Sequence, residues 1–485
     1  MTQWSLMKPR PPRRSRAAFA LAALTGLLCL TLCALSVQAE AEGALPPPSQ
    51  LATLKLGAAV QWALEHNPAL LTFRKNRGIA QAAVQIARQY PFNPIIQDYV
   101  WYAQGAPVNR GASVTNPIFN EHTMRLDLEL RHQGRYRRAM AQAALTRTEW
   151  EIAAQELLTS ILVTRAFNTL LYRQGKYRLL EEGTQLTEQI AGLTEQLFAQ
   201  GNVTSADLLL AQADVVEARN SLGPGRGAVI VAENDLRRAL GILGESFAVV
   251  GTLEKGYVAP PADLLVQAAM ERRPDLHALE FAVREAEQRQ KLEIANRYGN
   301  PSLGPAMEYN ETNVIFTGMW LIWQLPIINQ RKGEIRQRQA EVARAGQAMQ
   351  QGEISVRQDV FAAVARLSRA EEAVKTFTTQ TLPTLRKTRE ELDKLYVAKQ
   401  TGIDLAGIIS IRRRLLTARD GYLDALWDMS QAQVDLAAAV ADLSFAGCRA
   451  ATLASEAEPS NTPSPTQEQP PNGEQLPPPT PVPGK

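Results

Sequence analysis

The most regular pattern of apolar and polar positions in this chain is an alternation around residues 124–131. The apolar residues are Met124, Leu126, Leu128 and Leu130, and the charged residues between them are Arg125, Asp127, Glu129 and Arg131. A period of two predicts an extended strand with one apolar face and one ionic face. We place this strand at about residues 121–131 and three more at about 95–104, 303–310 and 313–325.

The rest of the chain predicts long helices, because apolar residues recur every three or four positions. One such seam comprises Val356, Val360, Ala363, Leu367, Ala370 and Val374. A longer seam comprises Ile408, Ile411, Leu415, Ala418, Tyr422, Ala425, Met429, Ala432, Leu436, Ala439 and Leu443. Sustained spacing of this kind is typical of coiled-coil packing, and the alanines allow helices to approach closely. An ordinary long soluble bundle has the same spacing, so the heptads alone leave both architectures open.

The chain also repeats itself after about 200 residues. The two copies open with 58-AAVQWALEHNPAL-70 and 264-LLVQAAMERRPDL-276, and each leads through a proline-containing break into a strand pair. A long helix with a basic start follows each pair, and a turn-Asp-Leu segment follows each long helix. We therefore predict a duplicated helix–strand pair–helix unit, with repeat one at residues 51–260 and repeat two at 261–448.

The predicted strands have the length of strands that cross a membrane, about 9–12 residues. In that interpretation Met124, Leu126, Leu128 and Leu130 face lipid, while Arg125, Asp127, Glu129 and Arg131 face a watery lumen. Four strands cannot close a barrel, and an open edge in lipid leaves backbone groups unpaired. Three chains would have to share one twelve-stranded barrel, with the helices continuing as a common cylinder. A small soluble sheet on a helical bundle fits the same residues, which do not choose between the two.

Both ends of the chain differ in composition from its centre. Residues 1–39 are predicted to be a cleaved signal peptide, with a basic start, an apolar run over 17–35 and a small-residue site at 37–39. Residues 40–50 form a proline-rich lead, and residues 449–485 are predicted to be a disordered proline-rich tail.

Removing the signal changes the charge balance. Its five Lys/Arg, taken from 52 in the whole chain, leave 47 basic residues against 49 acidic ones. This balance gives no reason to expect nucleic acid as a partner. Cys448 is then the only cysteine, so no internal disulfide is expected.

The residue types of catalysis and cofactor binding are not grouped in this sequence. The histidines are scattered, at His66, His122, His132 and His277. The glycine-rich stretch 223-GPGRG-227 lacks the Lys-Ser/Thr ending of a phosphate-binding loop. We therefore expect no enzyme activity, no cofactor and no metal site.

Taken together, these motifs resemble those of the TolC-type outer-membrane efflux proteins, most closely the cobalt-zinc-cadmium (CzcC-like) group. The resemblance spans about residues 51–445. It depends on the two repeat openings, on the strand-to-helix passages 128-LELRHQGRYRRA-139 and 325-LPIINQRKGEIRQRQAE-341, and on the two turn-Asp-Leu segments. Each motif is loose by itself, but their order and duplication are specific.

The resemblance implies a mainly helical homotrimer with a shared twelve-stranded β-barrel in the outer membrane and a helical tunnel through the periplasm. Such a protein is a passive duct that contacts outer-membrane lipid, docks on a periplasmic adaptor and receives substrate from an inner-membrane pump of the RND type. Divalent heavy-metal ions are the implied substrate. A periplasmic adaptor and a secreted structural coiled-coil protein are the alternatives, although neither requires two strand pairs.

The resemblance also implies a gate at the periplasmic hairpin tips, at residues 198–209 and 396–407. Asp404 matches the first gate aspartate of the family and Tyr396 an aromatic residue of the same network. The sequence departs from the family at Gln400, where a cation is usual, and at Gly407, where an aspartate is frequent. Asp207 has the equivalent place in the first tip, where we prefer a helix-capping role.

One segment departs from the long-helix pattern. Residues 221-SLGPGRG-227 contain three glycines and a proline, so we expect the helix to break or kink there.

Overall fold

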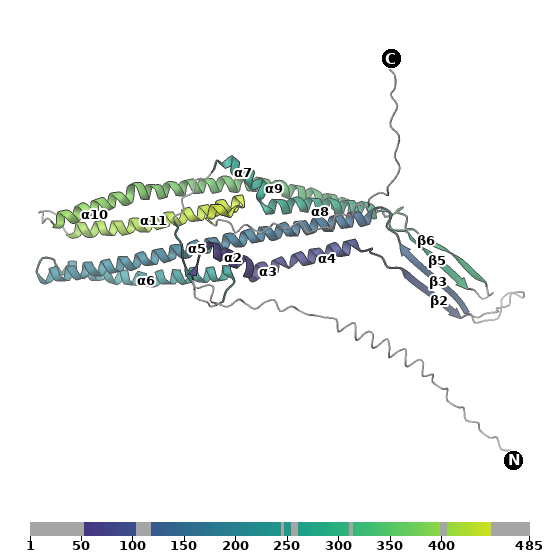
Figure 1. Cartoon of the computed structure of the whole chain (residues 1–485), viewed down its shortest axis with the longest axis horizontal. Coiled ribbons are helices and arrows are strands. Elements are labelled where there is room, and N and C mark those ends of the chain that lie inside the picture. Colours follow the sequence, from purple (N-terminus) through teal and green to yellow (C-terminus); the bar gives the residue numbers. More distant parts are fainter. Residues whose placement is uncertain are drawn as a thin grey trace, which may run out of the picture. The chain divides into compact units, whose positions relative to one another are not determined.

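The computed structural model describes residues 53–102, 118–243, 247–253, 260–309, 314–397 and 405–447. The predicted signal peptide, the proline-rich lead and the proline-rich tail lie outside these residues. The described parts belong to one compact unit (Figure 1).

The first half of the chain contains three short helices, a strand pair and two long helices. In order these are β1 (Thr53–Leu54), α2 (Leu56–His66), α3 (Pro68–Arg74), α4 (Asn76–Arg88), β2 (Ile95–Tyr102), β3 (Ile118–Asp127), α5 (Gln133–Ala199) and α6 (Ser205–Leu240).

The second half follows the same general order. Its elements are β4 (Ala248–Val249), α7 (Ala262–Arg272), α8 (Pro274–Asn296), β5 (Ser302–Tyr309), β6 (Ile315–Ile322), α9 (Lys332–Thr376), the π-helical turn η2 (Phe377–Thr381), α10 (Leu382–Val397), α11 (Leu405–Val440) and the 3-10 helix η3 (Leu443–Ala446). Here α8 is in the place of α3 and α4, and α9, η2 and α10 are in the place of α5.

The duplication extends to backbone conformation. Asn67 and Arg273 precede the prolines that open α3 and α8, and both have ψ of 118°. His132 and Arg331 precede α5 and α9, and both have the left-handed conformation, with φ of 59° and 51°. Non-glycine residues adopt this conformation infrequently, so its occurrence at both passages indicates the same turn from strand into helix.

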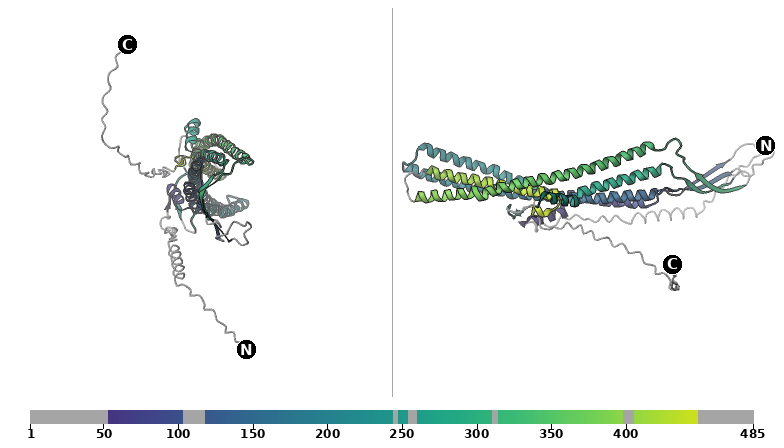
Figure 2. Two further views of the ribbon diagram at one scale, coloured as in Figure 1. Left: turned by 90° about the vertical axis from the view of Figure 1, so that its right-hand side faces the viewer. Right: turned by 90° about the horizontal axis from the view of Figure 1, so that it is seen from above.

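The long helices pack as two hairpins. Hairpin 1 consists of α5 and α6, and hairpin 2 of α9, η2, α10 and α11; α5 also packs against α8 and α11 (Figures 1 and 2). The predicted seams form the contacts: Val356, Val360 and Leu367 are buried in α9, as are Met429 and Leu436 in α11. The seam prediction is thus confirmed.

The main core lies where the short helices meet the hairpins. There β1 and β4 form a parallel pair, and Leu54, Phe167, Leu236 and Leu436 belong to one buried cluster. Phe167 is 1% exposed and Leu236 is fully buried, so this region joins both halves of the chain.

The four longer strands form one antiparallel sheet of order β2-β3-β5-β6. All four strand predictions are confirmed in position, with shifts of a few residues at their ends. The central pairing, β3 with β5, joins the two repeats. β2 and β6 each have one edge with no partner among the described residues.

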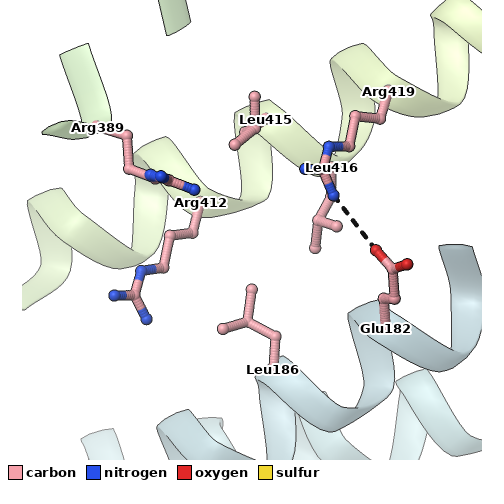
Figure 3. A pocket seen from close by; sticks show the side chains of 7 residues that line it. All are labelled: Glu182, Leu186, Arg389, Arg412, Leu415, Leu416 and Arg419. Carbon is pink, nitrogen blue, oxygen red and sulfur yellow. Dashed lines mark hydrogen bonds and ion pairs between the residues drawn. The ribbon is translucent and has the colours of Figure 1, made fainter. Parts of the chain in front are cut away.

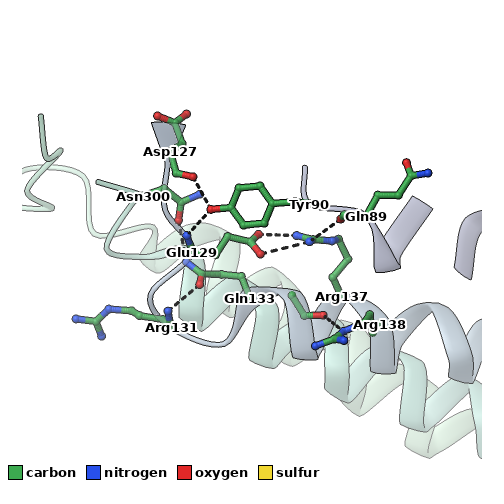
Figure 4. Close-up of polar contacts among 10 residues, drawn as sticks. Gln89, Tyr90, Asp127, Glu129, Arg131, Gln133, Arg137, Arg138 and Asn300 are labelled. Atoms are coloured by element: carbon green, nitrogen blue, oxygen red, sulfur yellow. Dashed lines mark hydrogen bonds and ion pairs between the residues drawn. The ribbon is translucent and has the colours of Figure 1, made fainter. Parts of the chain in front are cut away.

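β3 ends four residues earlier than the alternation predicts. The strand stops at Asp127, so Leu128, Glu129, Leu130 and Arg131 form the passage into α5. The backbone of Leu128 still donates to the carbonyl of Pro301 at 2.8 Å. Beyond it the backbone N–H of Glu129 donates to the Tyr90 hydroxyl at 3.1 Å (Figure 4). The Tyr90 side chain thus takes the place of a neighbouring strand as the hydrogen-bond partner of the backbone, and the chain turns here toward α5.

Of the break or kink predicted at residues 221–227, the break is wrong, because α6 continues through Pro224 without interruption. A proline within a helix removes one hydrogen bond and costs about 3 kcal/mol. The packing of α6 along α5 compensates here. Gly225 lies against Leu180 and Tyr177 of α5, where a Cβ would be 2.8 Å from the Leu180 Cδ1 atom. The glycine therefore permits close approach of the two helices.

Among the described residues, no helix combines the length and the apolar character needed to cross a membrane.

We expect Gly304→Ala to destabilise the sheet. A Cβ at Gly304 of β5 would overlap the backbone carbonyl of Met124 and lie 2.8 Å from the Cα of Arg125 in β3. Because rigid backbone cannot move aside cheaply, the two strands must separate, at about 1–3 kcal/mol. The measurement is the thermal midpoint of the purified protein.

Gly318→Ala is the matched control, since a Cβ on this β6 glycine would have no neighbour within 4 Å. Equal midpoints for the two variants would contradict the close approach of β3 and β5.

Candidate functional site

The ends of the two hairpins lie together, opposite to the sheet. Hairpin 1 turns between Ala199 and Ser205, and hairpin 2 between Val397 and Leu405. Figure 2 shows the ends of α6, α10 and α11 at the same end of the helices. This is the end at which the resemblance implies a gate.

Asp207 has a structural role in the turn of hairpin 1. Its carboxylate accepts from the backbone N–H of Thr204 at 3.0 Å, and its own N–H donates to the Thr204 hydroxyl at 3.2 Å. The pair is a capping box that starts α6. Hydrogen bonds from the Thr204 side chain and backbone lower the pKa of Asp207. The helix-capping interpretation of this residue is therefore the one that the structure shows.

The structure does not test the other candidate gate residues. Tyr396 lies near the end of α10, while Gln400 and Asp404 lie outside the described residues. Their role in a gate remains a prediction.

The end segments of the two hairpins carry opposite net charge. Residues 177–219 of hairpin 1 contain seven Asp/Glu and two Lys/Arg. Residues 382–419 of hairpin 2 contain nine Lys/Arg and four Asp/Glu. Ion pairs cross between them: Arg413 of α11 bonds Asp214 of α6, and Arg419 of α11 lies 3.3 Å from Glu182 of α5. Counting charges by segment could have found this polarity in the sequence.

A more protected polar cluster ties the hairpins further from their ends. Lys176 of α5 lies 2.7 Å from Asp420 and 2.9 Å from Asp424 of α11. The hydroxyl of Tyr172 donates to Asp424 at 2.5 Å, and the Tyr172 ring stacks on Trp427 at 5.2 Å between centroids. Desolvation acts to lower the pKa of Lys176, but the hydrogen bonds to Asp420 and Asp424 outweigh it, and the pKa is raised.

Asp435 provides a third connection between the hairpins. This residue of α11 binds Arg165 of α5 at 2.5 Å and also pairs with Arg366 of α9. One carboxylate thus joins three helices.

A cavity of about 280 Å³ lies between the hairpins, near the ion pair of Glu182 and Arg419. Figure 3 shows the guanidinium groups of Arg389 and Arg412 on one side of it and the Glu182–Arg419 pair on the other. Three leucine side chains also line it, at Leu186, Leu415 and Leu416. The cavity therefore combines cationic and apolar surface. Sequence reasoning missed it, since its lining comes from three separate helices.

The sheet has two faces of different character. Leu126 of β3 is paired with Leu303 of β5, which is paired with Leu321 of β6, so one face carries a row of leucines. Asp127 is paired with Ser302 on the opposite face, where their side chains form a hydrogen bond. Glu121 and Glu308 are paired on that same face. The assignment of Met124 and Leu126 to lipid and of Arg125 and Asp127 to the lumen remains a prediction.

The residues that follow β3 have other contacts. The carboxylate of Glu129 binds Arg137 of α5 at 2.5 Å, and the guanidinium of Arg131 lies 3.6 Å from the centre of the Tyr298 ring. Leu130 is 66% exposed. Leu128 and Leu130 no longer alternate as strand residues, so their predicted lipid contact does not follow from strand geometry.

No three His, Cys, Asp or Glu side chains within the described ranges are placed to hold a metal ion together. Three of the four histidines instead have local partners: His66 stacks on Trp62, His277 stacks on Trp150, and His122 lies 2.9 Å from Asp98.

The described residues form two long helical hairpins joined to a four-stranded sheet. The sequence model of the Outer membrane efflux protein family matches residues 59–242. No curated protein matches the chain.

Solved structures share the fold over most of the chain. An outer membrane protein of Vibrio cholerae, VceC, has a TM-score of 0.60 at 16% identity, with 80% of this chain and 96% of VceC covered. A membrane protein from Pseudomonas aeruginosa has a TM-score of 0.65 at 18% identity, with coverage of 80% and 91%. The open state of the Neisseria gonorrhoeae MtrE outer membrane channel has a TM-score of 0.63 at 15% identity, with coverage of 81% and 91%.

Residues 59–242 are thus similar to the outer membrane efflux protein family, and about four-fifths of the chain shares the fold of these solved outer-membrane proteins.

We expect Lys176→Met to weaken the contact between the hairpins. It leaves Asp420 and Asp424 close together without their shared cation, which should cost about 1–3 kcal/mol of stability. Because the pKa of Lys176 is raised in the folded protein, its contribution is complete below its ordinary value of 10.5 and is lost as the pH rises further. A thermal midpoint measured at neutral pH tests this.

Lys394→Met is the control, because Lys394 is exposed and its ion pair among the described residues is with Glu391 of its own helix. A midpoint that falls equally in both variants would show that the loss is unrelated to the hairpin contact.

Proposed function

We propose that this protein is the outer-membrane channel of a tripartite efflux system, a passive duct for substrate delivered by a periplasmic adaptor and an inner-membrane pump. The main support is the match of fold over four-fifths of the chain to outer-membrane channels, together with the family match.

The arrangement of elements supports a closed ring of copies. Each strand of the sheet connects to one helix: β2 to α4, β3 to α5, β5 to α8 and β6 to α9. The helices pack in the same order, with α4 against α5, α5 against α8 and α8 against α9. The edge strand β2 is therefore on the same side of the chain as the outermost helix α4, and the edge strand β6 is on the same side as the outermost helix α9. A single interface between two copies can then cover both a strand edge and a helix.

The flanks also carry apolar side chains that suit such a contact. Ile79 and Ile86 of α4 are 70% and 68% exposed, and Ile354 and Phe361 of α9 are 49% and 51% exposed. In lipid the free strand edges would leave N–H and C=O groups unpaired at several kcal/mol each. We propose a homotrimer, in which three four-stranded sheets close one twelve-stranded barrel.

The proposal predicts recovery of the protein from the outer membrane, with a detergent-extracted mass of three chains. Ile86→Glu should reduce the trimer fraction, because it buries a charge between copies. The control Leu264→Glu alters an equally apolar residue, 59% exposed, on α7 outside the row. A single chain soluble in the periplasm would exclude the channel, and an unaffected trimer in Ile86→Glu would exclude this contact.

Divalent heavy-metal ions are the substrate that we propose, supported by the sequence resemblance to the cobalt-zinc-cadmium group. The channel should leave passing ions unbound, and no metal-holding group occurs among the described residues.

Cells that lack the protein should accumulate Co²⁺, Zn²⁺ and Cd²⁺, and the restored chain should return accumulation to its original level. Ethidium uptake, measured in parallel, serves as the organic comparison. Accumulation of ethidium with unchanged metal content would contradict the metal assignment and leave the channel assignment intact.

A further inference from the structure

We infer that both hairpins bend at one common level, the bending zone. The zone consists of residues 173–183 of α5, 212–231 of α6, 371–381 of α9 and η2, and 419–424 of α11. The main core keeps its packing while the segments between the zone and the hairpin ends move. The inference goes beyond the proposed function and does not depend on it, because it concerns motion within a single chain.

The four helices contact one another at this level through glycines. The glycines and the side chains that a Cβ there would meet are Gly225 with Leu180, Gly175 with Leu423, and Gly421 with Phe377. These contacts join α6 to α5, α5 to α11, and α11 to η2 in turn. The zone therefore crosses both hairpins at the same place.

The hydrophobic packing of the chain is interrupted in the zone. None of its side chains is buried within the chain, whereas Ala370 and Leu382, on either side of it in hairpin 2, are buried. Ala370 belongs to the main core, and Leu382 belongs to a separate small cluster on the side of the hairpin ends. Packing thus holds the segments on both sides of the zone, but not the zone itself.

The backbone of hairpin 2 is weakened in the zone by the π-helical turn η2. There the N–H of Leu382 donates to the carbonyl of Phe377, five residues earlier. The apolar seam of the hairpin advances by three or four residues up to Phe377, then by five to Leu382, and by three again to Leu385. The wide turn therefore absorbs one extra residue, and such turns are frequent sites of helix bending.

Two further features weaken the same turn. Pro383 has no N–H, so a carbonyl in the preceding turn lacks its usual helical donor. Threonine hydroxyls donate to carbonyls in and before η2: that of Thr376 to Glu372 at 2.9 Å, and that of Thr379 to Lys375 at 2.7 Å. Hydroxyl bonds of this kind favour bending of a helix.

The backbone of hairpin 1 is weakened at the same level by the segment 221-SLGPGRG-227. The long helices of the two hairpins contain two prolines, Pro224 within the zone and Pro383 two residues beyond it. Gly225 permits the close approach to α5, but a Cβ on Gly223 or Gly227 would have no neighbour within 4 Å. Packing does not account for these two glycines, and glycine inside a helix lowers its stability. They make α6 easier to bend.

Hydrogen exchange of the full protein, purified in detergent and followed by mass spectrometry, tests whether the zone opens. Amides of the zone should exchange faster than those of residues 355–367 of α9. Gly223→Ala combined with Gly227→Ala should slow exchange in α6 within the zone, about fivefold for each glycine. Because the helices contact one another at this level, exchange in residues 419–424 of α11 should slow as well.

Gly192→Ala combined with Gly346→Ala is the matched control. These glycines lie in α5 and α9 outside the zone, and a Cβ on either would have no neighbour within 4 Å. The control should leave exchange in the zone unchanged.

Deletion of Thr379 tests the π-helical turn, because it restores a four-residue step from Phe377 to Leu382. Combined with Pro383→Ala, the deletion should give a continuous α-helix and slow exchange in residues 371–381 about tenfold, the effect of one restored backbone hydrogen bond. Its control is Thr379→Ala combined with Pro383→Ala, which retains the extra residue and therefore the wide turn.

Distances between spin labels distinguish bending from local opening. One pair of labels, at Arg369 and Lys387, spans η2, and a second pair, at Gln350 and Ser368, lies within α9. All four residues are exposed, and the members of each pair are 18 residues apart, about 27 Å along a helix. Labelled chains are diluted with unlabelled ones. The pair that spans η2 should have the broader distance distribution, and the deletion variant should narrow it to the width of the second pair.

Equal widths for the two pairs in the unmodified protein would overturn the inference, as would exchange in the zone as slow as in residues 355–367. Slower exchange confined to α6 in the double glycine variant would also overturn it, because the hairpins would then bend independently. The mass of the extracted protein tests the proposed channel separately from all of these outcomes.

Discussion

The position of the sheet relative to the helices depends on a buried glutamine at the start of α5. Gln133 is 1% exposed; its amide donates to Asn300 at 2.9 Å and its carbonyl oxygen accepts from the backbone of Arg131 at 2.8 Å. Asn300 lies between α8 and β5 of the second repeat. The same residue therefore fixes the turn from β3 into α5 and holds the two repeats in register (Figure 4). A buried amide is costly unless both of its ends are bonded, so the junction tolerates one alignment of the two passages.

With this alignment, the strands of the sheet and the helices that connect to them lie side by side in the same order. With β3 and β5 joined at the centre, the strand edges left over are β2 and β6, and the helices left at the flanks are α4 and α9. If the strands and the helices followed different orders, a ring of copies would need one interface to close the sheet and a different interface to close the layer of helices. Here a single rotation between copies suffices, which is the property that lets a duplicated unit assemble into the proposed trimer.

Periodic patterns in the sequence predicted most of the helices and strands. Features that depend on contacts between segments far apart in the sequence were not predicted. The apolar seams gave α9 and α11 because burial at each position follows helical spacing. The alternation gave β3 but not its end, since the hydroxyl of Tyr90, distant in sequence, captures the backbone at Glu129. The break expected at Pro224 fails for a similar reason: local propensity is overridden by packing along α5. The cavity requires three helices to come together, which no local pattern encodes.

In the proposed ring of copies, the opposite charges of the hairpin ends would also attract neighbouring copies to each other. Around a closed trimer, hairpins 1 and 2 alternate, so each acidic end has a basic neighbour on both sides, one within its chain and one in the next copy. The attraction seen between Asp214 and Arg413 would then act between copies as well.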